Sequence, residues 1–119
     1  LGTNDLLQER QFTAEDTAQR MEAFLKKIMA EPAVSDGKIT LRLIAPARME
    51  YGAWIDEERL YLESRRLGEE YRKVAERMGI SFTDAGKWEI PVVYDGVHFS
   101  EEGHHIFAQK IQEELAWLR

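Results

Sequence analysis

An α/β fold with short parallel strands is the fold class that the sequence predicts. Two runs of aliphatic and β-branched residues, at 39–45 and 80–85, have the length of strands. The segments around them repeat apolar residues every three or four positions, which is the spacing of one helical face. Because a helix separates the two strands, they are expected to run parallel, joined by a right-handed crossover. The 119 residues suffice for one domain, spanning 1–119, without internal repeats.

The first helix is expected to follow a loop over residues 1–12. Thr13 is its predicted N-cap, and Asp16, three residues further on, can complete a start similar to a capping box. Pro32 lies past the end of this helix. The buried face is predicted to consist of Ala18, Met21, Leu25 and Ile28.

The middle of the chain is expected to be strand, helix and strand. Residues 33–37 are a predicted turn, and 39–45 then form a short, largely buried strand. The next helix is predicted to begin after Asp56 and to end at Gly79, where glycine commonly closes a helix. The second strand follows at 80–85. The buried face of the helix is predicted to contain Leu60, Leu67, Tyr71, Val74 and Met78.

The last helix is predicted to begin after Ser100, which suits an N-cap. Glu101 and Glu102 would then lie in its first turn, where negative charge is favoured. A loop over residues 86–99 precedes the cap. The buried stripe of the helix is predicted to be Phe107, Ile111, Leu115 and Leu118.

Composition argues against several classes of function. The net charge is −6 and the basic residues form no stripe, which argues against phosphate contacts with nucleic acid. No window approaches about 18 consecutive apolar residues, so no membrane span is expected. The chain has no cysteine, which excludes disulfides and thiolate zinc sites. That absence leaves the compartment open, with the cytoplasm favoured.

Asp95 and His98 are the first candidates for catalysis, in the stretch D-G-V-H shortly before the last helix. A carboxylate beside a histidine can accept its Nδ1–H, which fixes the tautomer and leaves Nε2 free as a general base. The alternative is an Asp–His turn that only shapes the start of a helix. The spacing alone does not decide between the two.

Asn4, in the stretch L-G-T-N-D at residues 1–5, is the next candidate. Its side-chain amide can donate a hydrogen bond to a developing oxyanion. The alternative is an asparagine that stabilises a turn through its own backbone. Active sites of open parallel sheets form where strands end and loops begin, which is where both stretches are expected.

The two stretches together resemble the SGNH (GDSL-type) hydrolase family, with L-G-T-N-D near the start and D-G-V-H-F before the last helix. F-T-D-A at residues 82–85 also looks like the arylesterase and acetylesterase branch of that family. The resemblance covers the whole chain in order. It implies the C-terminal part of a flavodoxin-like, three-layer α/β/α fold. It also implies a serine ester hydrolase that acts on small carbohydrate acetyl or aryl esters and needs no cofactor or metal.

The resemblance implies a role for each matching residue. His98 corresponds to the catalytic base, and Asp95 to the acid that orients it. Asn4 corresponds to the asparagine of the oxyanion hole. Gly2 would supply the turn that lets Asn4 face the site, and Asp5 would cap its own loop.

The nucleophile of the family has no counterpart in the chain, which matches only the last two of four sequence blocks and contains no G-D-S. The stretch S-D-G at residues 35–37 runs in reverse order and is interpreted as a turn. Ser64 is expected within a helix, Ser81 in a strand and Ser100 as a helix cap. The resemblance therefore implies that the nucleophilic serine lies on a missing N-terminal segment.

A partner is expected because two parallel strands make a poor sheet by themselves and leave unpaired edges. The partner would be the missing N-terminal half or another copy of the chain, and the ordered protein would be an oligomer. A catalytically inactive fragment that folds by such association is the alternative to an esterase.

Three further possibilities are weaker. A metal site at His98 would need His104 or His105, which point about 100° apart on a helix and cannot both converge on it. A flavodoxin-like phosphate binder would need a glycine-rich loop between strand and helix, which the chain lacks. Tyr51 and Trp54 could line an acyl or alcohol pocket, or pack their loop onto the core.

Overall fold

The α/β fold class is confirmed by a computed structural model, which describes residues 1–116. It contains two strands, five α-helices and one 3₁₀ helix in that part of the chain. In chain order these are α1 (Thr3–Gln8), α2 (Ala14–Met29), α3 (Pro32–Ser35), β1 (Arg42–Ala45), α4 (Glu58–Met78), β2 (Ser81–Asp84), η1 (Ala85–Trp88) and α5 (Glu101–Leu115).

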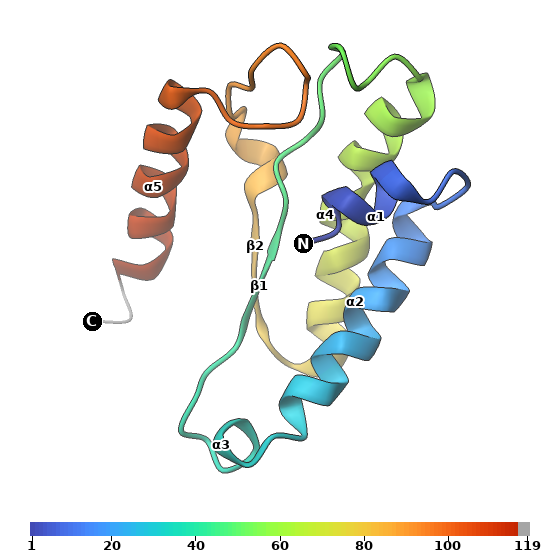
Figure 1. The fold of residues 1–119 in the computed structure, drawn as a ribbon. Helices are drawn as coiled ribbons and strands as arrows, with labels where there is room; N and C mark the ends of the chain where they lie inside the picture. Colours follow the sequence, from blue (N-terminus) through green and yellow to red (C-terminus); the bar gives the residue numbers. More distant parts are fainter. Residues whose placement is uncertain (117–119) are drawn as a thin grey trace.

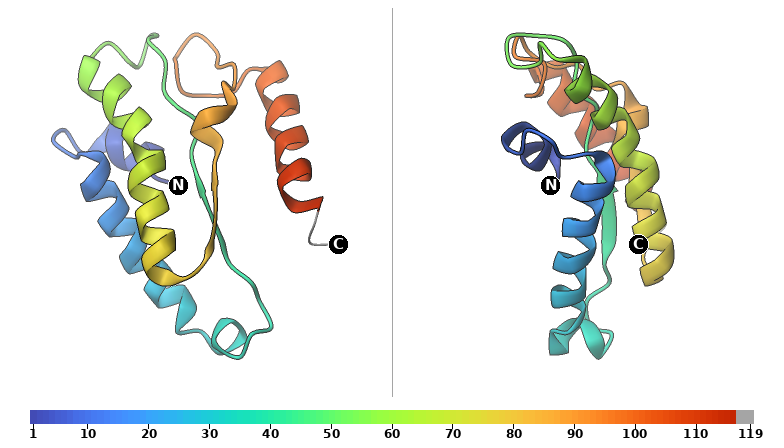
Figure 2. Two further views of the ribbon diagram at one scale, coloured as in Figure 1. Left: turned by 180° about the vertical axis from the view of Figure 1, so that it is seen from behind. Right: turned by 90° about the vertical axis from the view of Figure 1, so that its right-hand side faces the viewer.

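The two strands form a parallel pair that is covered on both faces. Arg42 pairs with Ser81 at one end and Ala45 with Asp84 at the other. Helix α4 is the crossover between them, and α2 packs beside it on the same face of the sheet, while α5 lies on the opposite face (Figure 1). Figure 2 shows the same layers from behind and from the side. The expected three-layer arrangement is therefore present.

The helix ends follow the local signals in the sequence. The Thr13 hydroxyl accepts the Asp16 N–H at 3.2 Å, and the Asp16 carboxylate accepts the Thr13 N–H at 3.0 Å, which completes the predicted capping box. Gly79 closes α4 in the left-handed conformation, with φ of 68°. Ser100 caps α5, since its hydroxyl accepts the Gly103 N–H at 3.0 Å. These three caps confirm the sequence predictions.

Five elements differ from expectation. The loop predicted over 1–12 contains α1, because Leu6 is completely buried and its burial outweighs local turn preference. The turn predicted over 33–37 lies largely within α3, and α4 starts after Glu57 rather than Asp56. Both strands are shorter than predicted, with four residues each, since each has only four partners in the pair.

The main core lies between the sheet and the α2–α4 face. Tyr71, Leu67 and Val74 of α4 are almost fully buried there, together with Leu6 from α1 and Met49 from the loop after β1. Cutting back Leu67, Leu6 or Met49 to alanine would cost about 2–5 kcal/mol each. This face therefore supplies most of the hydrophobic stability of the described residues.

The opposite face of the sheet, where α5 lies, is less fully covered. Phe107, Ile111 and Leu115 of α5 are only half-buried, so the stripe that was predicted to be buried is more exposed than expected. Trp88 of η1 contacts the Phe107 ring at 5.5 Å between centroids. A sheet of two short strands offers α5 little area to cover, which explains the exposure. Leu118, the last residue of the predicted stripe, lies outside the described residues.

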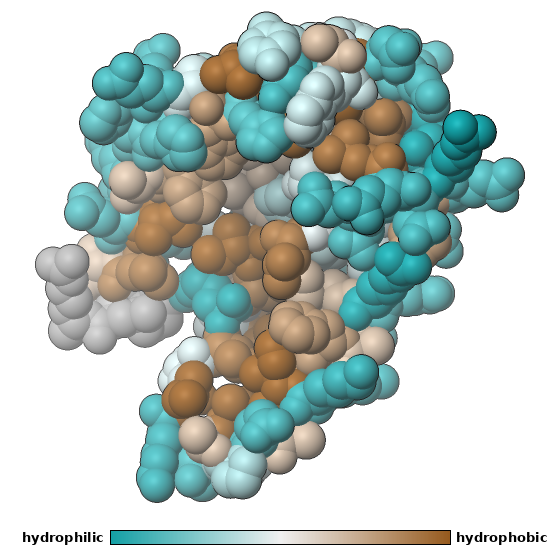
Figure 3. Space-filling model, viewed as in Figure 1, coloured by the Kyte–Doolittle hydropathy of each residue, from teal (hydrophilic) through white to brown (hydrophobic). Residues whose placement is uncertain are grey.

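The edge of β1 away from β2 has no strand beside it in residues 1–116. Apolar side chains gather on this side of the molecule (Figure 3). Leu1 is 81% exposed and Phe24 of α2 is 47% exposed. Within the described residues, no helix has the length and apolar character needed to cross a membrane.

Candidate active site

The Asp95 carboxylate organises the loop that leads into α5. Its Oδ1 accepts backbone N–H groups from Val97 at 2.8 Å and His98 at 2.9 Å. Its Oδ2 lies 2.6 Å from Nδ1 of the His98 ring. Asp95 is buried, with only 4% of its surface exposed, whereas the His98 side chain is 62% exposed. The pair thus has a buried anchor and an accessible ring.

The electrostatics of Asp95 favour its ionised form. Burial acts to raise the pKa of this carboxyl, but the hydrogen bonds from the backbone of Val97 and His98 and from the His98 ring outweigh it. The pKa of Asp95 is therefore lowered from its ordinary value. A carboxylate at this position accepts the Nδ1–H of His98 and leaves Nε2 unprotonated, which is the form of a general base.

Gly96 allows the tight path of this loop, although sequence reasoning did not single it out. Its φ of 85° is a conformation that favours glycine, and a Cβ there would overlap the carbonyl oxygen of Glu50. Glu50 in turn donates its backbone N–H to the Gly96 carbonyl at 2.9 Å. The signal was present in the sequence as the turn-forming pair D-G.

The loop after β1 forms the wall of the site. The Ala53 N–H donates to the Tyr94 carbonyl at 2.9 Å, and the Trp54 N–H donates to the Asp95 carbonyl at 3.1 Å. The Trp54 ring meets the His98 ring edge-on, with centroids 5.1 Å apart and planes 83° apart. Tyr51 instead stacks on Tyr61 of α4 at 4.5 Å. Of the two aromatic residues singled out in this loop, Trp54 is the one that contacts the candidate base.

The N-terminal stretch is built around Tyr71 of α4. Gly2 has φ of 109° and packs so closely on the Tyr71 hydroxyl that a Cβ would overlap it. That hydroxyl donates to the Leu1 carbonyl at 3.1 Å. Burial, together with the charge of Asp5, raises the pKa of Tyr71, so the group stays a neutral donor. Gly2 thus sets the entry into α1.

Asn4 and Asp5 lie on α1 rather than in a loop. The Asn4 side chain is exposed. Asp5 does not cap its own loop as predicted, because its carboxylate pairs with Arg20 of α2 at 3.4 Å and the start of α1 has no side-chain cap. The helical conformation turns this carboxylate toward the neighbouring helix.

The two candidate stretches meet at the carboxyl end of β1. A cavity of about 280 Å³ is lined by Leu1 and Thr3 on one side and by Val97 and Phe99 on the other, with Ala45 at the end of the strand. Thr3 immediately precedes Asn4, and Val97 and Phe99 flank His98. The structure therefore brings both motifs to one end of the sheet, although neither Asn4 nor His98 lines the cavity itself.

The four serines of the chain have other positions. The Ser64 hydroxyl accepts the Met49 N–H at 3.0 Å and donates to Tyr61. The Ser100 hydroxyl, besides capping α5, donates to the Pro91 carbonyl at 3.3 Å. Ser35 is exposed in α3, and Ser81 is in β2. Within residues 1–116, no serine is hydrogen-bonded to His98.

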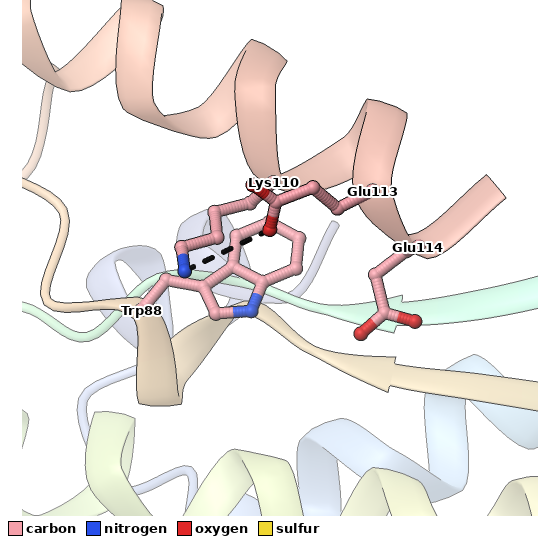
Figure 4. Close-up of a pocket in the computed structure, with 4 residues that line it drawn as sticks. All are labelled: Trp88, Lys110, Glu113 and Glu114. Carbon is pink, nitrogen blue, oxygen red and sulfur yellow. Dashed lines mark ion pairs between the residues drawn. The ribbon is translucent and has the colours of Figure 1, made fainter. Parts of the chain in front are cut away.

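Polar side chains also gather between η1 and α5. A cavity of about 310 Å³ between η1 and α5 is lined by Trp88, Lys110, Glu113 and Glu114 (Figure 4). His104 contacts the Phe99 ring, with centroids 5.4 Å apart, and His105 is exposed. Among the described side chains, no group of three or more His, Cys, Asp or Glu residues is arranged to hold a metal ion.

Solved structures with the same arrangement of elements are ester hydrolases. The carbohydrate acetylesterase Est24 from Sinorhizobium meliloti matches all of this chain with a TM-score of 0.84 and 22% identity, over 59% of its own length. An aryl esterase from M. smegmatis matches all of it with a TM-score of 0.84 and 21% identity, again over 59% of its own length. A protein assigned as an arylesterase in Agrobacterium tumefaciens is 26% identical over 98% of this chain and 57% of its own, with a TM-score of 0.80.

These similarities confirm the resemblance to SGNH-type esterases at the level of fold. The chain spans less than two thirds of each of these proteins, in agreement with a C-terminal portion. No protein-family model matches it, and no curated protein sequence matches it significantly.

Proposed function

We propose that this chain carries the proton-handling part of a serine ester hydrolase. The observation that supports this most directly is the 2.6 Å contact between Asp95 Oδ2 and His98 Nδ1, with the carboxylate buried and the ring exposed. Such a pair orients and activates a general base toward solvent or substrate. The esterase fold of the neighbours adds independent support.

The proposed reaction uses a serine that this chain does not supply. The serine Oγ attacks the carbonyl carbon of an acyl ester, and His98 Nε2 takes the hydroxyl proton. The tetrahedral intermediate then collapses, and the imidazolium donates that proton to the departing alkoxide. Water repeats the two steps to release the acid. Throughout, Asp95 stays ionised and stabilises the imidazolium through Nδ1–H.

Asn4 is proposed as a donor to the oxyanion of the tetrahedral intermediate. Its exposed amide lies one residue after Thr3, which lines the same cavity as Val97 and Phe99 beside the base. A donor at such a position stabilises the charge that develops on the carbonyl oxygen. The proposed substrates are small esters, either acetylated carbohydrates or aryl esters, because the neighbours are named for these activities.

The segment that supplies the nucleophile is also proposed to supply an additional parallel strand beside β1. Helix α4 is the crossover from β1 to β2, and α2 packs alongside it and leads into β1. A helix in that position is the second part of a right-handed β-α-β unit whose first strand would lie on the free edge of β1. The half-exposed apolar residues near this edge, such as Phe24, are suited to be covered by it.

A complementation experiment tests the proposal. The source reading frame is expressed with and without any coding sequence that precedes Leu1, and hydrolysis of p-nitrophenyl acetate is measured. We expect activity only when a G-D-S segment is present, joined or added in trans, and we expect His98→Gln to abolish it. His105→Gln, at an exposed histidine of α5, is the matched control and should retain activity.

Absence of a G-D-S segment, or activity that survives His98→Gln, would contradict the proposed function. If the joined protein is inactive but well folded, the alternative of an inactive chain that associates with a partner gains support. Light scattering would then distinguish a second copy, at twice the mass of 13.8 kDa, from a complementary segment.

A further inference from the structure

We propose that Trp54 is a positioning residue for His98, which holds the imidazole at the angle that its Nε2 needs. This inference rests on the proposed role of His98 as the base. The bond from Nδ1 to Asp95 fixes only one atom of a ring whose side chain is 62% exposed. A ring held at one atom can still rock about that hydrogen bond, so a productive orientation requires a second contact.

The Trp54 ring supplies that second contact. Its centroid lies 5.1 Å from the centroid of the His98 ring, at an interplanar angle of 83°, which is a favourable edge-to-face arrangement. Trp54 is 52% exposed, so burial in the core does not account for its position. Among the described residues, the ring contact of Trp54 is with His98, the proposed base.

The backbone of Trp54 is fixed to the same loop that carries the base. Its N–H donates to the Asp95 carbonyl at 3.1 Å. Gly52 and Ile55, on either side of it, exchange backbone hydrogen bonds at 3.2 and 3.1 Å and form a tight turn. Ile55 is buried, with 1% of its surface exposed, and anchors this turn in the core. Trp54 and His98 are therefore part of one hydrogen-bonded frame.

Helix α4 braces that frame from behind. Arg65 donates to the Met49 carbonyl at 2.7 Å and to the Glu50 carboxylate at 2.9 Å. Ser64 accepts the Met49 N–H at 3.0 Å. The loop after β1 is thus tied at its start to α4 and at its end to the loop of the base. Removal of the indole would free the ring of His98 without removing its bond to Asp95.

The test measures motion of the His98 ring by NMR relaxation in the full chain labelled at histidine. In the wild type we expect a rigid ring. Trp54→Leu should raise the population of reoriented His98 ring by about 2- to 10-fold, which is the change in population that the loss of one aromatic pair produces. Trp54→Phe should restore rigidity. Tyr94→Leu is the matched control, because Tyr94 is 80% exposed in the adjoining loop and has no ring contact among the described residues.

Each result decides the question. A mobile ring in the wild type, an unchanged ring in Trp54→Leu, or an equal effect of Tyr94→Leu would overturn the inference. In a complemented, active enzyme, Trp54→Leu should lower kcat with little change in KM, and Trp54→Phe should recover most of it. If no esterase activity exists but the ring responds as expected, only the proposed function fails. If the enzyme is active and the ring does not respond, only the role of Trp54 fails.

Discussion

The two stretches that carry the candidate chemistry are held in place in very different ways. The loop over residues 94–98 is fixed by its own backbone, by the Asp95 carboxylate and by the loop after β1. The stretch over residues 1–5 is fixed at Gly2 by Tyr71, whereas Asn4 projects its side chain toward solvent. The proposed acid–base pair is therefore preformed in this chain, whereas the side chain of the proposed oxyanion donor is exposed.

The largest effect is expected from a substitution in the preformed Asp95–His98 pair. Asp95→Asn should lower kcat/KM of the complete, active enzyme by about 10³- to 10⁴-fold, because the amide no longer holds the required tautomer of His98. Steady-state kinetics with p-nitrophenyl acetate would measure the loss. Asp36→Asn, at an exposed aspartate after α3, is the control and should change kcat/KM less than about twofold. Comparable activity in both variants would rule out Asp95 as the orienting acid.

The next largest effect is expected from a substitution in the stretch over residues 1–5. Asn4→Ala should lower kcat of the active enzyme by about 10²- to 10³-fold through the loss of one oxyanion donor. Its free energy of unfolding should change by no more than about 0.5 kcal/mol, because the side chain is exposed. Kinetics and denaturant unfolding of the same preparation would separate the two quantities. A loss of stability without a loss of rate would leave Asn4 as an ordinary residue of α1.

The third test measures how much the conformation of the 94–98 loop contributes to the free energy of unfolding. Gly96→Ala should reduce the free energy of unfolding by about 3 kcal/mol, because the left-handed backbone is strained for alanine and the new methyl group meets the Glu50 carbonyl. Gly37→Ala is a closely matched control, since Gly37 has a similar φ of 84° with open space around it. It should cost only about 1–2 kcal/mol. Equal costs in denaturant unfolding would show that packing against Glu50 contributes nothing.

The smallest expected effect concerns pH. Because the pKa of Asp95 is lowered in the folded chain, the folded state favours its carboxylate. The resulting stability is fully present above the ordinary aspartate pKa of about 3.9 and is lost as pH falls through the lower folded-state value. Thermal unfolding from about pH 6 to about pH 3 should therefore show a shallower acid decline in Asp95→Asn than in the wild type. Parallel declines would mean that Asp95 is not the group involved.

The sequence predicted those parts of the fold that depend on neighbouring residues. Thr13 and Asp16, Gly79 and Ser100 act as caps through contacts within a few residues, so their patterns were sufficient. The helical state of residues 3–8 was missed because it depends on burial of Leu6 against distant elements. Strand lengths were overestimated for a similar reason, since pairing partners decide where a strand ends.

The same distinction holds at the candidate site. The pairing of Asp95 with His98 spans three residues, and the sequence motif anticipated it. The contact of Trp54 with His98 links positions 44 residues apart, and no local pattern distinguishes Trp54 from Tyr51, which packs on Tyr61 instead. The close fit of Gly96 to Glu50 likewise depends on how two loops meet.

The short span of the Asp95–His98 pair also has a kinetic consequence. Closing a loop of a few residues takes well under a microsecond, whereas docking of separate segments takes milliseconds to minutes and depends on concentration. If the proposed nucleophile-bearing segment is a separate chain, the proposed base would already be in place when the two chains meet. The rate at which activity appears after mixing should therefore rise with partner concentration, and it should be set by the growth of the sheet along the open edge of β1.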